Sequence, residues 1–421
     1  MAFQFLFLFS HALNQMSQLN TVKNDAASDM IYYDITVSNF QSNAVAPQPF
    51  TFNETRTTPF VMCPQDYYMS ILRFSIDSGT LPVFIPSIQP SSVDPNLTIY
   101  SISMSWHDLV TDRTYNFQQF VEWIPQDVSI EVPDAPARTF NQLQLNDSGY
   151  YNCYSYTWLC YVIYRAMQQC MAGLEAAIVA GGVALYPAFT YSPALSWDTS
   201  SNRAVLYCDA QVWDLNSAFL PFQPANLYFN APLYGLFSSF PSRYMGYGRP
   251  FGKDFRILVV DVGGTNISPL IPPQAPPAEG EVYFSYLAVA TFQETSTTCN
   301  ITPIQAIVFC TSTMPVTPNQ VSTPLVYQNN STVGFMGSNA ATANILTDLI
   351  SDTGLYQPNL TYVPSAEYRL ISLHGNAPMN TIDISVFYRL RNGSLVPFRL
   401  CSGGSLTMKA GFISKKSKRG K

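Results

Sequence analysis

The sequence contains few charged residues. They make up 11% of the 421 residues, less than half of the usual share, and only seven of them are lysines. Hydrophobic residues reach 47% and aromatic residues 14%, which excludes a disordered chain. A nearly neutral surface rich in hydroxyl and amide groups suits extensive protein–protein contact, although secreted β proteins share this profile.

Residues that bind metals or form disulfide frameworks are also scarce. The chain has three histidines, His11, His107 and His374, too few for a histidine-based metal site. Its eight cysteines form no C-x-x-C pair, so neither a zinc ribbon nor a disulfide scaffold is indicated. We therefore expect no cofactor and no required metal.

No segment has about 20 consecutive apolar residues, the length that a membrane span requires. The apolar run at residues 2–9 (AFQFLFLF) is shorter, and no Lys or Arg precedes it, as a signal peptide would require. Residues 1–28 are therefore either a mobile N-terminal arm or a signal peptide.

Alternation of apolar and polar residues dominates the chain and predicts β-strands. The clearest segments are 31–38, 382–390 and 405–413. Further strand candidates are 50–55, 67–76, 97–106, 204–210, 281–293 and 303–311. The run at 255–262 fits either a strand or a buried helix. This pattern predicts a mostly β protein, a sandwich or barrel rather than a series of βαβ units.

One segment has helical spacing instead. Residues 156–180 contain no proline, and their few polar residues recur at helical intervals, so we predict one long, largely apolar helix that Gly181 and Gly182 close. A sheet or a neighbouring subunit must cover it, unless it acts on a membrane. A second short helix is predicted at 233–240. The five prolines of 269–277 indicate a surface loop or a domain boundary.

The C-terminus holds the sharpest charge asymmetry. Residues 415–421 read KKSKRGK, with positive charges at Lys415, Lys416, Lys418, Arg419 and Lys421. Without these five charges the formal net charge of −6 would be −11. A basic tail behind an acidic body can neutralise nucleic-acid phosphates without reading sequence, or simply add solubility.

Two triplets suggest an enzyme. Asp77-Ser78-Gly79 and Asp352-Thr353-Gly354 match the D-[ST]-G triplets of aspartic proteases, in which two carboxylates share a proton. The residues that follow, Thr80-Leu81 and Leu355, depart from that family's pattern, and the triplets lie 275 residues apart. Both triplets are also ordinary turn sequences, and we expect turns and no catalytic site.

Three stretches, 31–60, 66–90 and 380–412, resemble minor capsid, or penton-like, proteins of Polinton- and adintovirus-type double-stranded DNA viruses. Residues 233–244 and 364–373 support the resemblance. It implies a jelly-roll-type β-sandwich that forms a homo-oligomer, with a pentamer favoured, and contacts the major capsid protein in the virion. It further implies that the basic tail touches packaged double-stranded DNA.

The resemblance places the jelly-roll body at residues 29–414. An insertion at about 150–270 holds the long helix, and residues 415–421 form the tail. The alternative is a secreted or virion-surface β-sandwich that binds a receptor or glycan, with paired cysteines. An aspartic protease that uses Asp77 and Asp352 is the remaining enzyme hypothesis.

Overall fold

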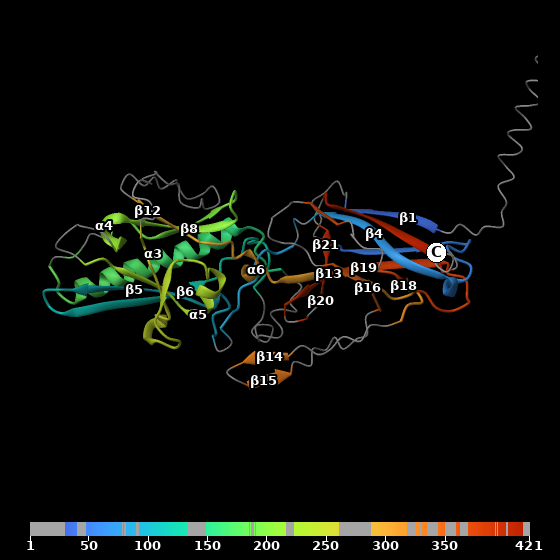
Figure 1. The fold of residues 1–421 in the computed structure, drawn as a ribbon. Coiled ribbons are helices and arrows are strands. Elements are labelled where there is room, and N and C mark those ends of the chain that lie inside the picture. Colours follow the sequence, from blue (N-terminus) through green and yellow to red (C-terminus); the bar gives the residue numbers. More distant parts are fainter. Residues whose placement is uncertain are drawn as a thin grey trace, which may run out of the picture.

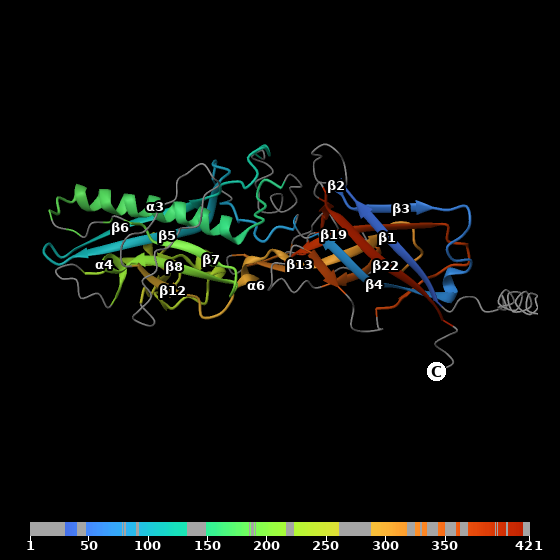
Figure 2. The same cartoon turned by 90° about the horizontal axis from the view of Figure 1, so that it is seen from above.

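The structure is a computed structural model. It describes residues 30–39, 48–77, 79, 81–89, 92–132, 149–184, 186, 189, 191–215, 223–260, 288–317, 325–328, 331–334, 344–349, 359–362, 369–391, 393, 395–400 and 403–415. These residues form two lobes that lie end to end in an elongated molecule (Figures 1 and 2). We call them the sandwich lobe and the distal lobe.

The sandwich lobe contains two antiparallel sheets. Their strand orders are β1-β22-β4-β17, with β18 also paired to β4, and β16-β13-β19-β20, with β3 also paired to β19. The strands are β1 (Met30–Ser38), β3 (Thr51–Thr55), β4 (Tyr67–Asp77), β13 (Ile304–Thr311), β16 (Asn344–Leu349), β17 (Asn359–Tyr362), β18 (Ile371–Ser372), β19 (Thr381–Leu390), β20 (Leu395–Pro397) and β22 (Ser405–Ser414). The rings of Phe74 in β4 and Phe309 in β13 meet edge to face at 5.2 Å, so the two sheets enclose one core.

The distal lobe combines two further sheets with helices. The sheets have the orders β10-β11-β9-β5-β6 and β12-β8-β7. The strands are β5 (Leu97–Asp108), β6 (Arg113–Glu122), β7 (Ala194–Asp198), β8 (Arg203–Asp209), β9 (Asn226–Phe229), β10 (Ser242–Tyr244), β11 (Phe255–Ile257) and β12 (Ala288–Phe292). The helices are α3 (Tyr156–Ala180), α4 (Ala210–Trp213), α5 (Ala231–Leu236), α6 (Thr298–Ile301) and the 3₁₀ helix η3 (Pro250–Gly252).

Shorter elements complete the described fold. They are the 3₁₀ helix η1 (Pro64–Asp66) and the strand pairs β2 (Gln48–Pro49) with β21 (Arg399–Leu400) and β14 (Leu325–Gln328) with β15 (Ser331–Gly334). The fold is mostly β, as the sequence predicted. The run at 255–262 could be either a strand or a buried helix from its sequence. In the structure it starts as strand β11 at Phe255.

Each lobe has its own hydrophobic core. The core of the distal lobe is assembled from residues between Val83 and Ile301, a wider range than the predicted insertion. The core of the sandwich lobe uses residues from both sides of this range. Ile85 packs against both cores and marks the junction of the lobes.

The alternating pattern works in β22 as the sequence predicted. Leu406, Met408, Ala410 and Phe412 are at most 2% exposed, whereas the intervening Thr407 is exposed. Successive side chains of a strand point to opposite faces, so this pattern buries one full row between the sheets.

The long helix begins and ends where the sequence predicted. It covers β5 and β6 and also contacts β7, where the rings of Tyr156 and Trp197 stack at 4.3 Å. The Gly181 amide donates to the carbonyls of Ala177 and Ile178 and closes the last turn. Among the described residues, no helix is long and apolar enough to cross a membrane.

A glycine allows α3 to approach β6 closely. A Cβ atom on Gly173 would lie 2.3 to 2.4 Å from three ring atoms of Phe117. These distances are shorter than non-bonded contacts of real Cβ atoms, so the Phe117 ring packs directly against the helix backbone. Glycine weakens a helix by about 1 kcal/mol relative to alanine, and the close packing offsets this cost.

We predict that Gly173→Ala lowers the free energy of unfolding by about 1–3 kcal/mol, because the new methyl group displaces the Phe117 ring. The matched control is Gly235→Ala in α5, where a Cβ atom meets nothing within 4 Å. The control should be neutral or slightly stabilising. Denaturant unfolding of both variants measures the effect, and equal midpoints would contradict it.

The end of β13 is held by a buried carboxylate. Asp383 in β19, 6% exposed, accepts the backbone amides of Ser312 and Thr313 at 2.6 and 3.0 Å. It also accepts the hydroxyls of Thr311, Ser312 and Thr313. Burial alone would raise the pKa of Asp383, but these hydrogen bonds outweigh it and lower the pKa from 3.8 to about 2.

Since the folded state lowers this pKa, Asp383 stabilises the protein above about pH 4, and the contribution is lost as the pH falls towards 2. We predict that Asp383→Asn costs about 2 kcal/mol at pH 7, and that its difference from the wild type shrinks between pH 4 and pH 2. Unfolding curves across this range measure it. Glu294→Gln, at an exposed side chain, is the control. If the unfolding free energies of Asp383→Asn and the wild type differ by the same amount at every pH, the role of Asp383 is contradicted.

Candidate functional site

The first residue of the predicted basic tail is anchored to the sandwich lobe. The Lys415 ammonium donates to the carbonyl of Gln65 at 2.6 Å, to the Ser372 hydroxyl at 2.8 Å and to the carbonyl of Leu373 at 3.1 Å. It also lies 5.0 Å from the centre of the Tyr68 ring. These contacts fix the point from which the tail leaves the fold.

The other predicted tail residues, Lys416, Lys418, Arg419 and Lys421, lie outside the described residues. Their role in binding phosphates therefore stays a prediction. Lys415, the first residue of the predicted tail, belongs to the sandwich lobe, which also holds the first described strand, β1 (Figures 1 and 2).

The aspartic protease hypothesis gains no support from Asp77. Its carboxylate accepts the backbone amide of Gly79 at 2.9 Å, the hydrogen bond of an ordinary turn. Asp352 lies outside the described residues. Within the described part of the chain, no three His, Cys, Asp or Glu side chains are placed to hold a metal ion.

The seven described cysteines are free thiols, and five of them are buried. The receptor-binding alternative predicted paired cysteines. Cys401 lies outside the described residues.

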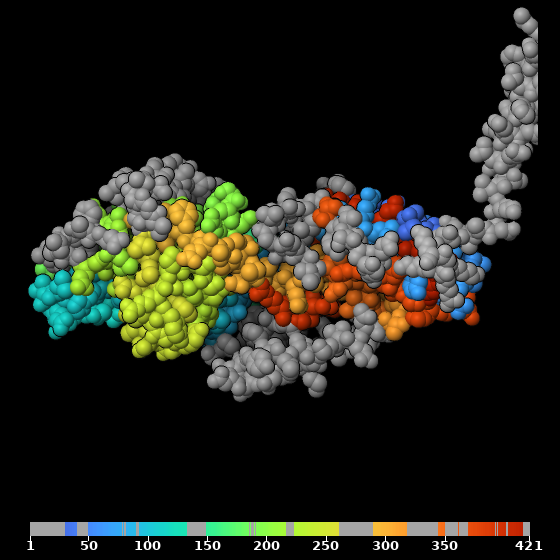
Figure 3. Space-filling model, viewed as in Figure 1, coloured from blue at the N-terminus to red at the C-terminus, as the bar shows by residue number. Residues whose placement is uncertain are grey.

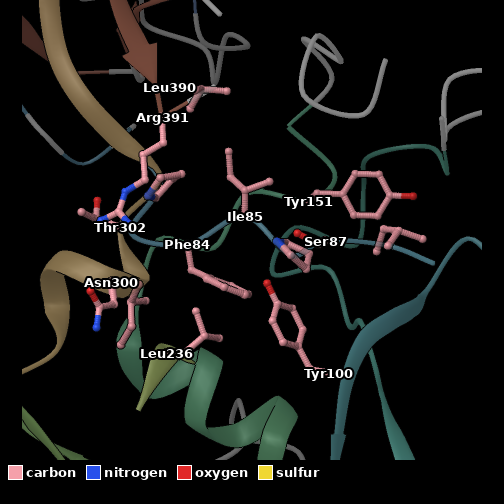
Figure 4. Close-up of a pocket in the computed structure, with 14 residues that line it drawn as sticks. Phe84, Ile85, Ser87, Tyr100, Tyr151, Leu236, Asn300, Thr302, Leu390 and Arg391 are labelled. Atoms are coloured by element: carbon pink, nitrogen blue, oxygen red, sulfur yellow. The ribbon is translucent and has the colours of Figure 1, made fainter. Parts of the chain in front are cut away.

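A cavity of about 180 Å³ lies at the junction of the two lobes. Its walls come from the segment that enters the distal lobe, from α5 and α6, and from the end of β19 (Figure 4). Tyr100 lies in its wall, where burial raises the pKa of the hydroxyl and a hydrogen bond with Ser87 partly opposes this. Arg391 lines the opposite wall.

The lining residues do not form a catalytic centre. They are Phe84, Ile85, Pro86, Ser87, Ile88, Tyr100, Tyr151, Leu236, Asn300, Ile301, Thr302, Pro303, Leu390 and Arg391. This set contains no carboxylate, histidine or cysteine, the side chains that most often serve as general base or activated nucleophile.

Comparison with known proteins defines the class. The chain is similar over 164 residues to the uncharacterized protein V18 of Sputnik virophage, at 31% identity, covering 39% of this chain and 95% of that protein. It is similar over 220 residues to the structural protein V19 of the same virophage, at 24% identity, covering 52% and 93%.

Two solved structures share the fold over almost the whole chain. A chain of the Sputnik virophage particle, determined by cryo-EM, superposes with a TM-score of 0.71 at 25% identity and covers 93% of this chain and 99% of that one. The mavirus penton protein superposes with a TM-score of 0.54 at 13% identity and covers 91% and 99%. The fold is thus that of viral capsid and penton proteins, a jelly-roll-type β-sandwich.

The protein is therefore a structural component of a virion and not an enzyme. The family described as Sputnik minor capsid protein V18/19 matches residues 31–414, and the chain belongs to this family. It is a minor capsid protein with a penton-like fold, as the sequence predicted.

Sequence reasoning missed a second cluster of charged side chains, in residues 242–256. The run Tyr244-Met245-Gly246-Tyr247-Gly248-Arg249 combines exposed aromatic residues, glycines and arginine. This composition is the signal that could have identified it, because tyrosine and arginine are enriched at protein interfaces.

Proposed function

We propose that this minor capsid protein assembles with copies of itself into a pentamer that contacts the major capsid protein, while its basic tail touches packaged double-stranded DNA. The observation that carries the proposal is the end-to-end superposition on a chain of a virus particle, with 93% of this chain covered. The Polinton- and adintovirus-type resemblance is part of the same proposal.

The proposal keeps the predicted division of the chain. Residues 1–28 are an N-terminal arm or signal, residues 29–414 are the body, whose predicted insertion at about 150–270 falls within the wider distal lobe, and residues 415–421 are the tail. The body is embedded in the shell through the sandwich lobe. Since the tail leaves from that lobe, the distal lobe then projects away from the DNA.

The assembly is tested first by the mass of the purified full-length protein. We expect particles of five times the 46.9 kDa chain mass in light scattering, with five-fold rings in electron micrographs. A monomer at every concentration would contradict self-assembly, and a trimer would contradict the pentamer while keeping a capsid role.

The tail is tested by deleting residues 416–421, which leaves the Lys415 anchor intact. We predict weaker binding to double-stranded DNA and a reduction of about 3 to 4 in the slope of log affinity against log salt, because four positive charges no longer release counterions. Fluorescence anisotropy with a labelled duplex measures both.

The matched control is Lys415→Met. It removes one tail charge and the three hydrogen bonds of the anchor, so it should lower stability and change the salt slope by no more than about 1. Equal DNA binding by the wild type and the deletion at low salt would exclude the DNA role of the tail.

A further inference from the structure

A hairpin on the distal lobe carries an unbalanced positive charge. Residues 242–256, which we call the basic projection, contain Arg243, Arg249, Lys253 and Arg256 but a single carboxylate, Asp254. They include β10, η3 and the start of β11. Figure 3 shows this segment, coloured yellow, on the surface of the distal lobe.

The single carboxylate does not neutralise these cations. Asp254 is 6% exposed, and its oxygens accept the backbone amides of Ala231 at 2.8 Å and Arg249 at 3.2 Å. No described carboxylate forms an ion pair with a basic side chain of the projection. The carboxylate therefore anchors the hairpin, and its cations have no anionic partner among the described residues.

Two of the cations face each other. Arg243 and Arg256 are direct partners across the β10–β11 pair, an arrangement that is destabilising for like charges. The Nε atom of Arg256 is buried without a hydrogen-bond partner in the described structure. Arg243 is the exposed member of the pair, so it is the arginine that an anionic partner can reach.

The projection is also rigid and partly apolar. Tyr244, Tyr247 and Phe251 are 53%, 71% and 49% exposed. Phe251 has a φ of 59°, in the left-handed region, and its carbonyl accepts the Ser103 hydroxyl. Phe255 stacks on the Tyr234 ring at 3.9 Å and contacts the Tyr244 ring at 5.1 Å. Rigid aromatic side chains beside arginine are typical of binding hot spots.

The same lobe carries a surface of opposite charge. Residues 122–132, which we call the acidic segment, contain three exposed carboxylates, Glu122, Asp127 and Glu131, and no basic residue. Hydrogen bonds from Ser129 lower the pKa of Asp127 and keep it ionised. Val128 and Val132 are 84% and 48% exposed and offer apolar contact for the aromatic side chains.

The two surfaces belong to the same sheet, and the projection folds back over it, since η3 contacts β6 and the Lys253 ammonium donates to Asn116 of β6. β10 and β6 are the opposite edge strands of the five-stranded sheet, and the acidic segment begins at the last residue of β6. Among the described residues, no ion pair joins the carboxylates of the acidic segment to the cations of the projection. Contacts between two different patches of identical chains are head to tail, and they close into rings when the rotation permits.

We infer that the basic projection of one subunit binds the acidic segment of a second copy, with the arginines against the carboxylates and the tyrosines against the valines. This inference rests on the proposed self-assembly and names the surfaces that produce it. It accounts for the arginine pair, the rigid aromatic side chains and the exposed valines together.

The test reverses exposed charges in the full-length protein. Arg243→Glu with Arg249→Glu should raise the concentration at half assembly about ten- to a hundredfold in mass photometry, because like charges then meet across the contact. The double variant Glu122→Arg with Glu131→Arg should by itself raise the concentration at half assembly by a similar factor. All four changes combined should restore assembly. At high salt, the difference in assembly concentration between each double variant and the wild type should become smaller.

Arg113→Glu is the control, since Arg113 is an exposed cation outside both surfaces, and it should assemble like the wild type. A wild type that never assembles would overturn the proposed self-assembly and this inference with it. Wild-type rings that persist unchanged in both charge-reversed variants would overturn this inference alone. Loss of binding to a heparin column in the arginine variant, with assembly intact, would assign the projection to a polyanion instead.

Discussion

The sandwich lobe depends on one long-range pairing. Strand β22, near the C-terminus, lies between β1 and β4, and its backbone pairs with both over nine residues each. Without β22, the first sheet has no continuous core face. Residues from the two ends of the chain must therefore meet before this lobe is stable, and such non-local pairing is slow to form.

This closure determines where the rest of the chain can lie. β4 ends at Asp77 and β13 begins at Ile304, and the chain between them forms the distal lobe with its own core. The two connecting segments run through the junction that Ile85 and the small cavity mark. A lobe with its own core, joined through two segments, can vary in sequence and surface without disturbing the pairing of β22.

The elements that the sequence predicted best are those in which local pattern and tertiary contact agree. β1, β19 and β22 alternate over most of their length, and α3 is a proline-free run that ends at Gly181 and Gly182. β6 was missed because Gln119 interrupts the row of Tyr115, Phe117 and Val121. Phe117 and Tyr115 of β6 lie against α3 at Gly173 and Gly181, and no local pattern reveals that contact.

The same contrast between local sequence pattern and tertiary contact holds for the candidate binding surfaces. The basic tail is contiguous and therefore visible in the sequence, and its role stays a prediction, whereas the arginine pair exists only because the β10–β11 register sets Arg243 opposite Arg256. In a chain with 11% charged residues, most of the surface contributes no electrostatic preference. The few places where charge of one sign gathers therefore decide which faces of two subunits attract and which repel.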